Sequence, residues 1–341
     1  MKILIIRFSS IGDILLTTPV IRCLKLQTDA EIHFLVKKNF APVLQNNPYI
    51  LKKHLFENWD EDLLHKLKAE KFDLIIDLHK NLRSRRFIWA IGVTSLSFDK
   101  INGEKWLKTA LKIDVLPKLH IVDRYLNAIS KLNVVNDGKG LDFFLNEIDE
   151  EELSSFFKAQ NVQFKDKKYI AIAIGSAQQT KVPTLELYQN IIRKLDFPVI
   201  LLGSKSEKAF GDKIMAGCKG KTIVNAAGAL KLGASIACLK HAVLLISPDT
   251  GLMHAATAMD IPIVVIWGNT IPEFGMNPYY GAERINKSFN SEVLGLRCRP
   301  CSKIGYKTCP KRHFDCMKQQ SVESIVENIL KLIHKFEINK Y

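Results

Sequence analysis

Carboxylate, hydroxyl and glycine residues gather directly after a short apolar segment near the amino terminus, and they suit proton transfer from a hydroxyl group. Ser9-Ser10-Ile11-Gly12-Asp13 follows residues 2–7 and opens a helical pattern. Because a helix start exposes unpaired N–H groups with partial positive charge, it favours the ionised form of Asp13. Asp13 could therefore act as a general base, or it could simply cap the helix, as aspartate often does.

A second set, Ser247-Pro248-Asp249-Thr250-Gly251, follows an apolar segment and leads into another helical pattern. Proline, glycine and a small hydroxyl residue at a helix start form a concave group of amide donors that suits a diphosphate. Asp249 would repel phosphate, so it should face sugar hydroxyls. His254 lies four positions after Thr250, on the same helix face, and could donate to an anion. A helix cap followed by a core histidine is the simpler alternative.

A third set, Gly175-Ser176 with Thr180-Lys181-Val182-Pro183, follows the apolar residues 169–174. A lysine held beside a proline could neutralise charge on a leaving diphosphate. By itself this segment would be a loop with a solvated lysine. The loop after residues 2–7 has one glycine and no Gly-Lys-Ser/Thr, so it matches neither a dinucleotide-binding fingerprint nor a P-loop.

These loops must be positioned by strands, because ligands of open parallel sheets bind beyond the carboxyl ends of the strands. Near-continuous Ile, Leu and Val runs without strict alternation predict strands covered on both faces by helices. The expected strands are 2–7, 31–36, 72–77, 169–174, 198–202, 222–225, 242–247 and 262–267. The expected helices are 11–27, 61–70, 185–195, 206–218, 230–240, 251–260 and 322–336.

This alternation predicts an α/β protein of two Rossmann-like, doubly wound domains facing a central cleft. The expected domains are residues 1–155 and 165–325, joined by a polar, acidic linker. Residues 326–341 would form a final helix that continues the second domain or crosses back to the first.

The charge balance of the 341 residues favours anionic partners. There are 49 Lys and Arg against 35 Asp and Glu, a net charge of +14. This suits nucleic acid, an anionic membrane face or phosphorylated small molecules. No apolar run approaches the roughly 20 residues that span a bilayer, and the first apolar run is too short for a secretory signal. We therefore expect a cytoplasmic protein.

Four of the seven cysteines lie close together in the sequence. Cys298, Cys301, Cys309 and Cys316, with His313 among them, offer soft ligands at spacings compatible with a tetrahedral structural zinc. The second pair is separated by six residues, unlike a standard zinc ribbon. Reduced thiols packing a long loop, or disulfides formed after cell disruption, are the alternatives.

Taken in order, these motifs resemble glycosyltransferase family 9, the ADP-heptose:lipopolysaccharide heptosyltransferases. The resemblance runs through Ser-Ser-Ile-Gly-Asp with Thr18-Pro19, the Gly175 and Lys181 segment, Gly203 with Glu207, and Asp249-Thr250-Gly251-x-x-His254 followed by Trp267-Gly268. It implies the GT-B architecture, with the acceptor bound mainly by the first domain and the nucleotide-sugar donor by the second. After Gly268 the sequence departs from the common family pattern, in a loop that the resemblance places close to the donor sugar.

The resemblance also implies roles for individual residues. Asp13 matches the base that deprotonates the acceptor hydroxyl for inverting displacement, Lys181 the lysine at the donor diphosphate, and Glu207 an acid near the ribose. Leu230 matches a wall of the adenine pocket. The remaining donor-binding positions are Ser176, Thr180, Asp249, Thr250, Gly251 and His254. No cofactor is required for catalysis, because lysine and amide donors take the place of a cation at the leaving group.

Residues 79–131 form a basic stretch with a dense start. We expect Ser10 and the cations Lys80, Arg83, Arg85 and Arg86 to receive an anionic, lipid-linked oligosaccharide at the inner face of the cytoplasmic membrane. A solvated basic helix is the alternative.

Two other functions are compatible with parts of the sequence. The net charge and the cysteine segment could belong to a basic nucleic-acid-binding protein with a zinc-ribbon-like tail, although this leaves the phosphate-type helix starts unexplained. A nucleotide-sugar epimerase or hydrolase with the GT-B fold would share the architecture but would act without an acceptor.

Overall fold

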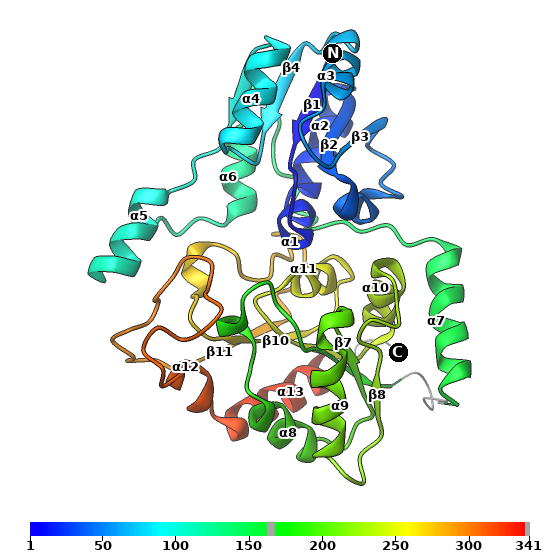
Figure 1. Ribbon diagram of the computed structural model, residues 1–341, viewed down its shortest axis with the longest axis vertical. Helices are drawn as coiled ribbons and strands as arrows, with labels where there is room; N and C mark the ends of the chain where they lie inside the picture. Colours follow the sequence, from blue (N-terminus) through cyan, green and yellow to red (C-terminus); the bar gives the residue numbers. More distant parts are fainter. Residues whose placement is uncertain (162–167, 338–341) are drawn as a thin grey trace. The chain divides into compact units, whose positions relative to one another are not determined.

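The computed structural model describes residues 1–161 and 168–337, which form two α/β units (Figure 1). Unit 1 comprises Met1–Ile101, Leu119–Phe144 and Gly281–Arg284, and unit 2 comprises the other described residues. Residues 162–167, part of the expected linker and of the start expected for the second domain, and residues 338–341 lie outside the described residues. No helix among the described residues is long and apolar enough to cross a bilayer.

Unit 1 is built on a parallel sheet in the order β3-β2-β1-β4-β5. Its strands are β1 Lys2–Ile6, β2 Glu31–Lys37, β3 Lys52–Phe56, β4 Leu74–Asp77 and β5 Ser95–Ser97. Its helices are α1 Ile11–Leu15, α2 Thr18–Thr28, α3 Glu61–Ala69, α4 Leu82–Ile91 and α6 Ile121–Asn127, with 3-10 turns η1 Lys38–Leu44 and η3 Ser130–Leu132. The central strand β1 is almost wholly buried, as a strand covered on both faces must be.

One helix expected over residues 11–27 is in fact two, α1 and α2. Pro19 lies within the first two positions of α2. A proline inside a continuous helix would leave the carbonyl of Leu15 without a donor and clash with it. The same residue is favourable at a helix start, so α2 begins afresh at Thr18.

Unit 2 is built on a second parallel sheet, in the order β11-β10-β9-β6-β7-β8. Its strands are β6 Ile170–Ala173, β7 Val199–Leu202, β8 Ile223–Asn225, β9 Leu244–Pro248, β10 Ile263–Trp267 and β11 Ser288–Glu292. Its main helices are α5 Asn102–Trp106, α7 Glu147–Ala159, α8 Leu185–Arg193, α9 Lys208–Ala216, α10 Leu232–His241, α11 Gly251–Ala258, α12 Asp315–Lys318 and α13 Val322–Glu337. Its short turns are η2 Leu107–Leu111, which is π-helical, and the 3-10 turns η5 Gln179–Lys181, η6 Lys205–Glu207 and η7 Pro272–Phe274.

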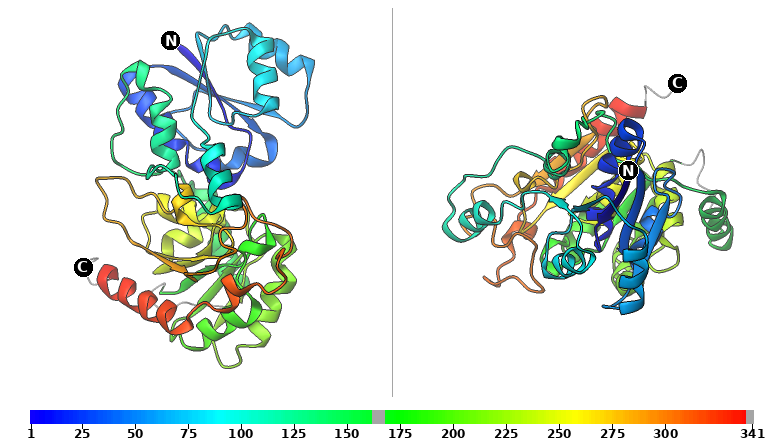
Figure 2. Two further views of the ribbon diagram at one scale, coloured as in Figure 1. Left: turned by 90° about the vertical axis from the view of Figure 1, so that its left-hand side faces the viewer. Right: turned by 90° about the horizontal axis from the view of Figure 1, so that it is seen from above.

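Two groups of helices cover this sheet. Helix α10 packs against both α7 and α11, while α8 packs against both α9 and α13 (Figure 2). The buried core between sheet and helices is dominated by Ile, Leu and Val. The doubly wound fold expected from the apolar runs is therefore confirmed in both units.

The unit boundaries differ from the expected domains in three places. Helix α7 was assigned to the first domain but packs on α10, where Glu150 pairs with His241 at 2.7 Å. Residues 102–118 also belong to unit 2, whereas residues 281–284 belong to unit 1. Helix α13 packs on α8 and on strands of unit 2, so it continues the second domain. Such contacts depend on distant residues, which the local patterns do not reveal.

Candidate functional site

Each sheet has one point where the strand order reverses, and Asp13, Lys181 and Asp249 follow the strands that meet there. In unit 1 the chain passes from β1 outward through β2 and β3, then returns to β4 on the other side of β1. In unit 2 it passes from β6 through β7 and β8, then returns to β9 on the other side of β6. At such points the loops leaving adjacent strands diverge, and ligands of open α/β sheets bind in the space they leave.

In unit 1, Asp13 is held from both sides. Its Oδ1 lies 2.7 Å from the guanidinium of Arg7, which directly follows β1. Its Oδ2 accepts hydrogen bonds from the Ser10 hydroxyl at 2.8 Å and the Ser10 backbone N–H at 3.2 Å. Ser10 is the N-cap of α1. Asp13 is the third residue of the helix and forms a capping box with Ser10, so it is not itself the N-cap. About a quarter of its side chain (27%) remains exposed, which leaves the carboxylate accessible to a hydroxyl.

Charge and hydrogen bonding keep Asp13 ionised. Burial alone would raise its pKa, but the Arg7 charge and the Ser10 hydrogen bonds outweigh that effect and hold the pKa below the ordinary 3.8. Asp13 is thus a carboxylate throughout the neutral range and can accept a proton there. The same hydrogen bonds mean that the Ser10 hydroxyl, predicted to contact an acceptor, is engaged with Asp13.

Sequence reasoning missed Arg7 and its surroundings. The Arg7 guanidinium is only 8% exposed and donates to the carbonyl of Leu78, 2.5 Å away, and to the hydroxyl of Tyr125, 3.2 Å away. These contacts fix the guanidinium in place and therefore fix Asp13. His79, which follows β4, packs on Phe8 and has its pKa lowered to about 3 by burial and by Arg7. The proximity of these residues follows from the pairing of β1 with β4, which the sequence pattern alone does not show.

Replacing Arg7 by methionine is expected to move the acidic limb of the pH profile to higher pH. The effect of burial on the Asp13 pKa would then be opposed only by the Ser10 hydrogen bonds, so that pKa rises and Asp13 is protonated earlier as the pH falls. Loss of an opposite charge at this distance shifts a pKa by about one to three units. The pH dependence of kcat/KM measures this shift. Arg7→Lys keeps the charge and should stay close to wild type, whereas an unmoved limb in Arg7→Met would contradict the role assigned to Arg7.

In unit 2 the loops after β6 and β9 meet through Lys181 and Asp249. The Lys181 ammonium lies 2.6 Å from Asp249 Oδ2, and both side chains are largely buried, at 15% and 13% exposed. Ser176 donates to the Asp249 carbonyl at 3.0 Å, and Thr270 donates to the same carboxylate oxygen at 3.2 Å. Thr270 belongs to the segment where the sequence departs from the family pattern, so this segment contacts the site.

The start of α11 carries the groups that the sequence predicts to bind an anion. Thr250 is the N-cap and its side chain makes no capping hydrogen bond, so its hydroxyl is available to a ligand. Gly251 is the first helical residue, and the first N–H groups of a helix lack intrahelical partners. Lys181 therefore lies beside a group of amide donors, where it can add a full positive charge.

Glu207 lies at the same edge of the sheet, after β7. Its carboxylate accepts from the Ser204 N–H at 2.8 Å and from the Ser206 hydroxyl at 2.6 Å. These bonds outweigh burial and lower its pKa, so it is an ionised acceptor suited to ribose hydroxyls. A Cβ on Gly175 would lie 2.8 Å from the Glu207 side chain, so a larger residue there would displace the Glu207 carboxylate.

A pocket of about 910 Å³ adjoins Glu207 within unit 2. Gly175 and Glu207 line it together with Lys307 and Arg312 of the cysteine segment and Lys318 of α12. The volume is that of a small-molecule site. Lys181, Asp249 and Thr250 do not line it, so it covers only one part of the predicted donor site.

Three predicted donor-binding residues are buried. Thr180 is 3% exposed, and its hydroxyl donates to the Tyr306 carbonyl and accepts from the Tyr306 N–H. These hydrogen bonds attach the cysteine segment to the loop after β6, and Thr180 also lines the pocket beside Glu207. His254 is 2% exposed in α11 and Leu230 is 9% exposed after β8. A buried leucine fits an apolar wall.

The basic residues of the first domain lie on α4 and just before it. Arg83, Arg85 and Arg86 are all exposed, and the Arg86 guanidinium also stacks over the ring of Trp59, 3.7 Å from its centroid. Lys80 donates to the Phe98 carbonyl at 2.7 Å. The predicted acceptor-binding cations are thus not equivalent, because two of the four have partners within the unit.

The four clustered cysteines line one small cavity of about 20 Å³, together with His313. Cys298 Sγ lies 3.7 Å from His313 Nε2. The buried amide of Asn269, also in the lining, finds no hydrogen-bond partner among the residues that the structure describes. Among the described residues, one group of three or more His, Cys, Asp or Glu side chains has ligand atoms that all lie within 4.8 Å of one another. That group lies in unit 1 and includes none of these cysteines.

Comparison with known proteins agrees with this geometry. The model of glycosyltransferase family 9 (heptosyltransferase) matches residues 61–306. Lipopolysaccharide heptosyltransferase 1 of Campylobacter coli is 27% identical over 292 residues, which cover 79% of this chain and 84% of that protein.

Solved structures match over nearly the whole chain. A family 9 glycosyl transferase from Veillonella parvula superimposes with a TM-score of 0.78 at 21% identity, covering 98% of this chain and 97% of that one. The ADP-heptose lipopolysaccharide heptosyltransferase II of Escherichia coli superimposes with a TM-score of 0.73 at 20% identity. The match covers 99% of this chain and 100% of that one. The two parallel-sheet units have the GT-B fold, as predicted.

Proposed function

Because the chain belongs to glycosyltransferase family 9, we propose that it transfers a heptose from ADP-heptose to the core of a lipopolysaccharide acceptor. The observation that carries the proposal is that each sheet's switch point holds a group the reaction needs. Unit 1 holds the ionised Asp13. Unit 2 holds Lys181 beside the start of α11.

The proposed reaction is a single displacement with inversion. The acceptor hydroxyl oxygen attacks the anomeric carbon of the heptose, and the bond from that carbon to the diphosphate oxygen breaks. Asp13 takes the hydroxyl proton and later releases it to water. The negative charge that forms on departing ADP is stabilised by Lys181 and by the N–H groups at the start of α11.

Donor binding uses the remaining polar groups of unit 2. The Glu207 carboxylate accepts hydrogen bonds from the ribose, and Leu230 packs on the adenine. Lys181 turns from Asp249 to the diphosphate. The Asp249 carboxylate can then accept hydrogen bonds from the sugar hydroxyls.

Thermal stabilisation by nucleotide sugars tests the donor assignment. A ligand that binds only the native state raises its melting temperature. ADP-heptose is expected to raise Tm more than GDP- or UDP-sugars at equal concentration. Absence of any response to these sugars would contradict the assignment of unit 2 as a donor site.

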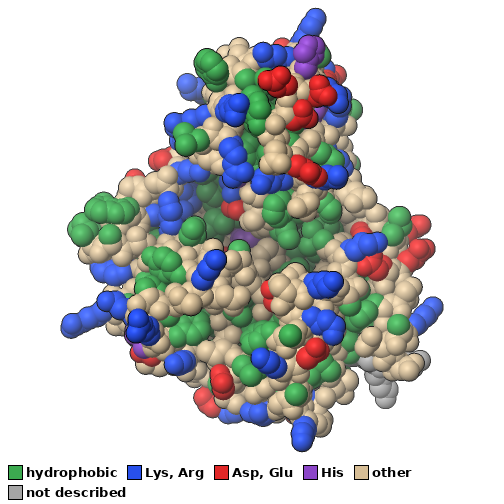
Figure 3. Space-filling model, viewed as in Figure 1, with side chains coloured by type: hydrophobic (Ala, Val, Ile, Leu, Met, Phe, Trp, Pro, Cys, Tyr) green, Lys and Arg blue, Asp and Glu red, His purple; other side chains and the backbone are tan. Residues whose placement is uncertain are grey.

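For the acceptor, we propose that the exposed face of α4 binds the anionic lipid-linked oligosaccharide at the membrane surface. Arg83 and Arg85 supply charge, and Leu82 and Trp89 are 83% and 86% exposed on the same helix. Figure 3 shows Lys and Arg side chains interspersed with hydrophobic ones on the part of the surface that carries α4. Exposed aromatic and basic side chains together are typical of a membrane interface.

The double variant Arg83→Ala/Arg85→Ala is expected to raise the KM for acceptor by about 30-fold, since each charge contributes about 1 kcal/mol at an anionic surface. The KM for ADP-heptose should not change. Steady-state kinetics with each substrate varied in turn measures both values. Lys66→Ala/Lys68→Ala removes the same charge from exposed positions of α3 and should behave as wild type. Equal acceptor KM values in the two double variants would reject the role of α4.

For the cysteine segment, we propose a structural metal ion, zinc, held by Cys298, Cys301, Cys309 and Cys316. A tetrahedral set of four sulfur ligands suits zinc or iron, and small shifts around the cavity would bring the thiolates into reach. The ion would hold the loop that Thr180 attaches to unit 2.

Protein purified without a histidine tag is expected to contain one more zinc per chain than Cys298→Ser/Cys301→Ser. The variant should also melt at lower temperature while keeping its kcat at temperatures where it is folded. Elemental analysis gives the metal count. Cys218→Ala, outside the segment, is the matched control. Equal metal content in wild type and the double variant would exclude this site.

A further inference from the structure

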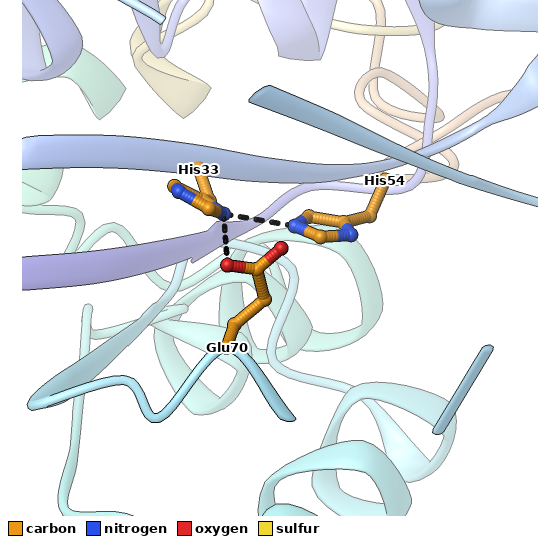
Figure 4. Close-up of side chains that lie close together, drawn as sticks. All are labelled: His33, His54 and Glu70. Carbon is orange, nitrogen blue, oxygen red and sulfur yellow. Dashed lines mark hydrogen bonds and ion pairs between the residues drawn. The ribbon is translucent and has the colours of Figure 1, made fainter. Parts of the chain in front are cut away.

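A group of side chains in unit 1 that the transfer reaction does not use converges on one point. His33 of β2, His54 of β3 and Glu70 after α3 bring one ligand atom each to within 4.8 Å of the others (Figure 4). His33 Nδ1 lies 2.9 Å from His54 Nε2 and 3.9 Å from Glu70 Oε2. The two histidines are 2% and 5% exposed, so these are interior groups.

Strand register produces this convergence. His54 pairs with Leu35 and His33 pairs with Lys52, so the imidazoles are diagonal neighbours on the same face of the sheet. The end of α3 brings Glu70 to that face. Phe72 packs its ring edge-on to both imidazoles, with centroids 5.2 and 6.1 Å away, and restricts their movement. The ligand atoms are therefore held in place by the fold.

We propose that His33 Nδ1, His54 Nε2 and a Glu70 carboxylate oxygen bind a divalent metal ion of the zinc class, with water as a fourth ligand. Zinc accepts imidazole nitrogen and carboxylate oxygen at about 2.0 to 2.2 Å. Nitrogen atoms 2.9 Å apart can both lie at that distance from one ion, at an angle of about 90°. Only a small increase in the distance between the two nitrogen atoms is needed for the angle at the ion to become tetrahedral.

Two lysines form ion pairs with the Glu70 carboxylate, and the metal ion must displace at least one of them. Lys52 lies 2.5 Å from Oε1, and Lys2 lies 3.3 Å from Oε2. The Lys52 side chain is 56% exposed and can turn into solvent. Exposed ion pairs of this kind contribute little to stability, so a metal bond can replace one. Burial lowers the pKa of both imidazoles, so each ring keeps a lone pair at neutral pH.

The proposed ion has a structural role. His33 lies in the first half of β2 and His54 at the middle of β3, whereas Asp13 lies beyond the carboxyl end of β1. The ion would tie the edge strand β3 to β2 and to the end of α3. It should therefore change the stability of the protein and leave the chemistry of transfer unaffected.

Zinc binding to the full-length protein tests the proposal, using metal-stripped wild type and the Glu70→Gln and His54→Gln variants. Glu70→Gln keeps the shape of the side chain, and circular dichroism checks the fold of each variant. Each variant should bind one zinc fewer per chain at micromolar zinc, or bind that zinc about tenfold or more weakly. Zinc should also raise their Tm less than that of wild type.

His65→Gln, at an exposed position of α3, is the matched control and should bind zinc as wild type does. The cysteine segment is intact in every one of these proteins, so its contribution to the zinc count cancels. Equal zinc content and equal zinc-dependent Tm in wild type, Glu70→Gln and His54→Gln would overturn the proposal. His33 and His54 would then be a hydrogen-bonded pair only.

Discussion

Replacing Asp13 by asparagine is expected to lower kcat by about 10²- to 10⁴-fold, the range that a positioned general base contributes. Asparagine fills the same space, and its carbonyl can still accept from Ser10, but it cannot take a proton. In the proposed site ADP binds through groups of unit 2, so its affinity should be unchanged. Initial rates with ADP-heptose and acceptor, together with calorimetric titration of ADP, measure the two quantities.

Ser10→Ala is the matched control for this variant. It removes the hydroxyl that donates to Asp13 and leaves the carboxylate and Arg7 in place. Its kcat should fall far less than that of Asp13→Asn. A kcat of Asp13→Asn near the wild-type value would show that another group takes the proton.

Replacing Lys181 by methionine is expected to lower kcat/KM by about 10²- to 10³-fold, the usual effect of removing one group that stabilises a developing negative charge. The loss has two causes. The diphosphate loses a cation, and the largely buried Asp249 carboxylate loses its partner and repels the donor. ADP affinity should therefore fall together with the rate.

The double variant Lys181→Met/Asp249→Asn separates these causes. Removing the uncompensated carboxylate should restore part of the ADP affinity lost in Lys181→Met, so the two substitutions will not be additive. Calorimetric titration of ADP against the wild type, both single variants and the double variant completes the cycle. Additive losses would show that the ion pair has no part in donor binding.

The positions of the reactive loops could be predicted from sequence because they follow from local patterns. Apolar runs indicated the strands, and the residues after them, Asp13 and Asp249 among them, were expected at the carboxyl edges of the sheets. The neighbours of these residues were not predictable. Arg7 directly follows β1 and gives no local signal, and its contacts come from β4 and α6, about 70 and 120 positions later.

Other features of the structure also depend on distant residues. The Thr180 hydroxyl is engaged by Tyr306, 126 positions away, which its residue type does not reveal. Strands β3 and β11 were missed because Lys52–Phe56 and Ser288–Glu292 are rich in polar residues, as edge strands often are. The His33 and His54 pair depends on strand register, which becomes visible only once β3 is placed beside β2.

Product analysis with ADP-heptose and a heptose-free lipid A core acceptor tests the central claim most directly. Wild type is expected to release ADP only when acceptor is present and to add one heptose, with inverted anomeric configuration, to each acceptor modified. Asp13→Asn should bind ADP-heptose but give almost no product. Release of ADP or an altered sugar nucleotide without acceptor, at a rate equal to that with acceptor, would contradict the account.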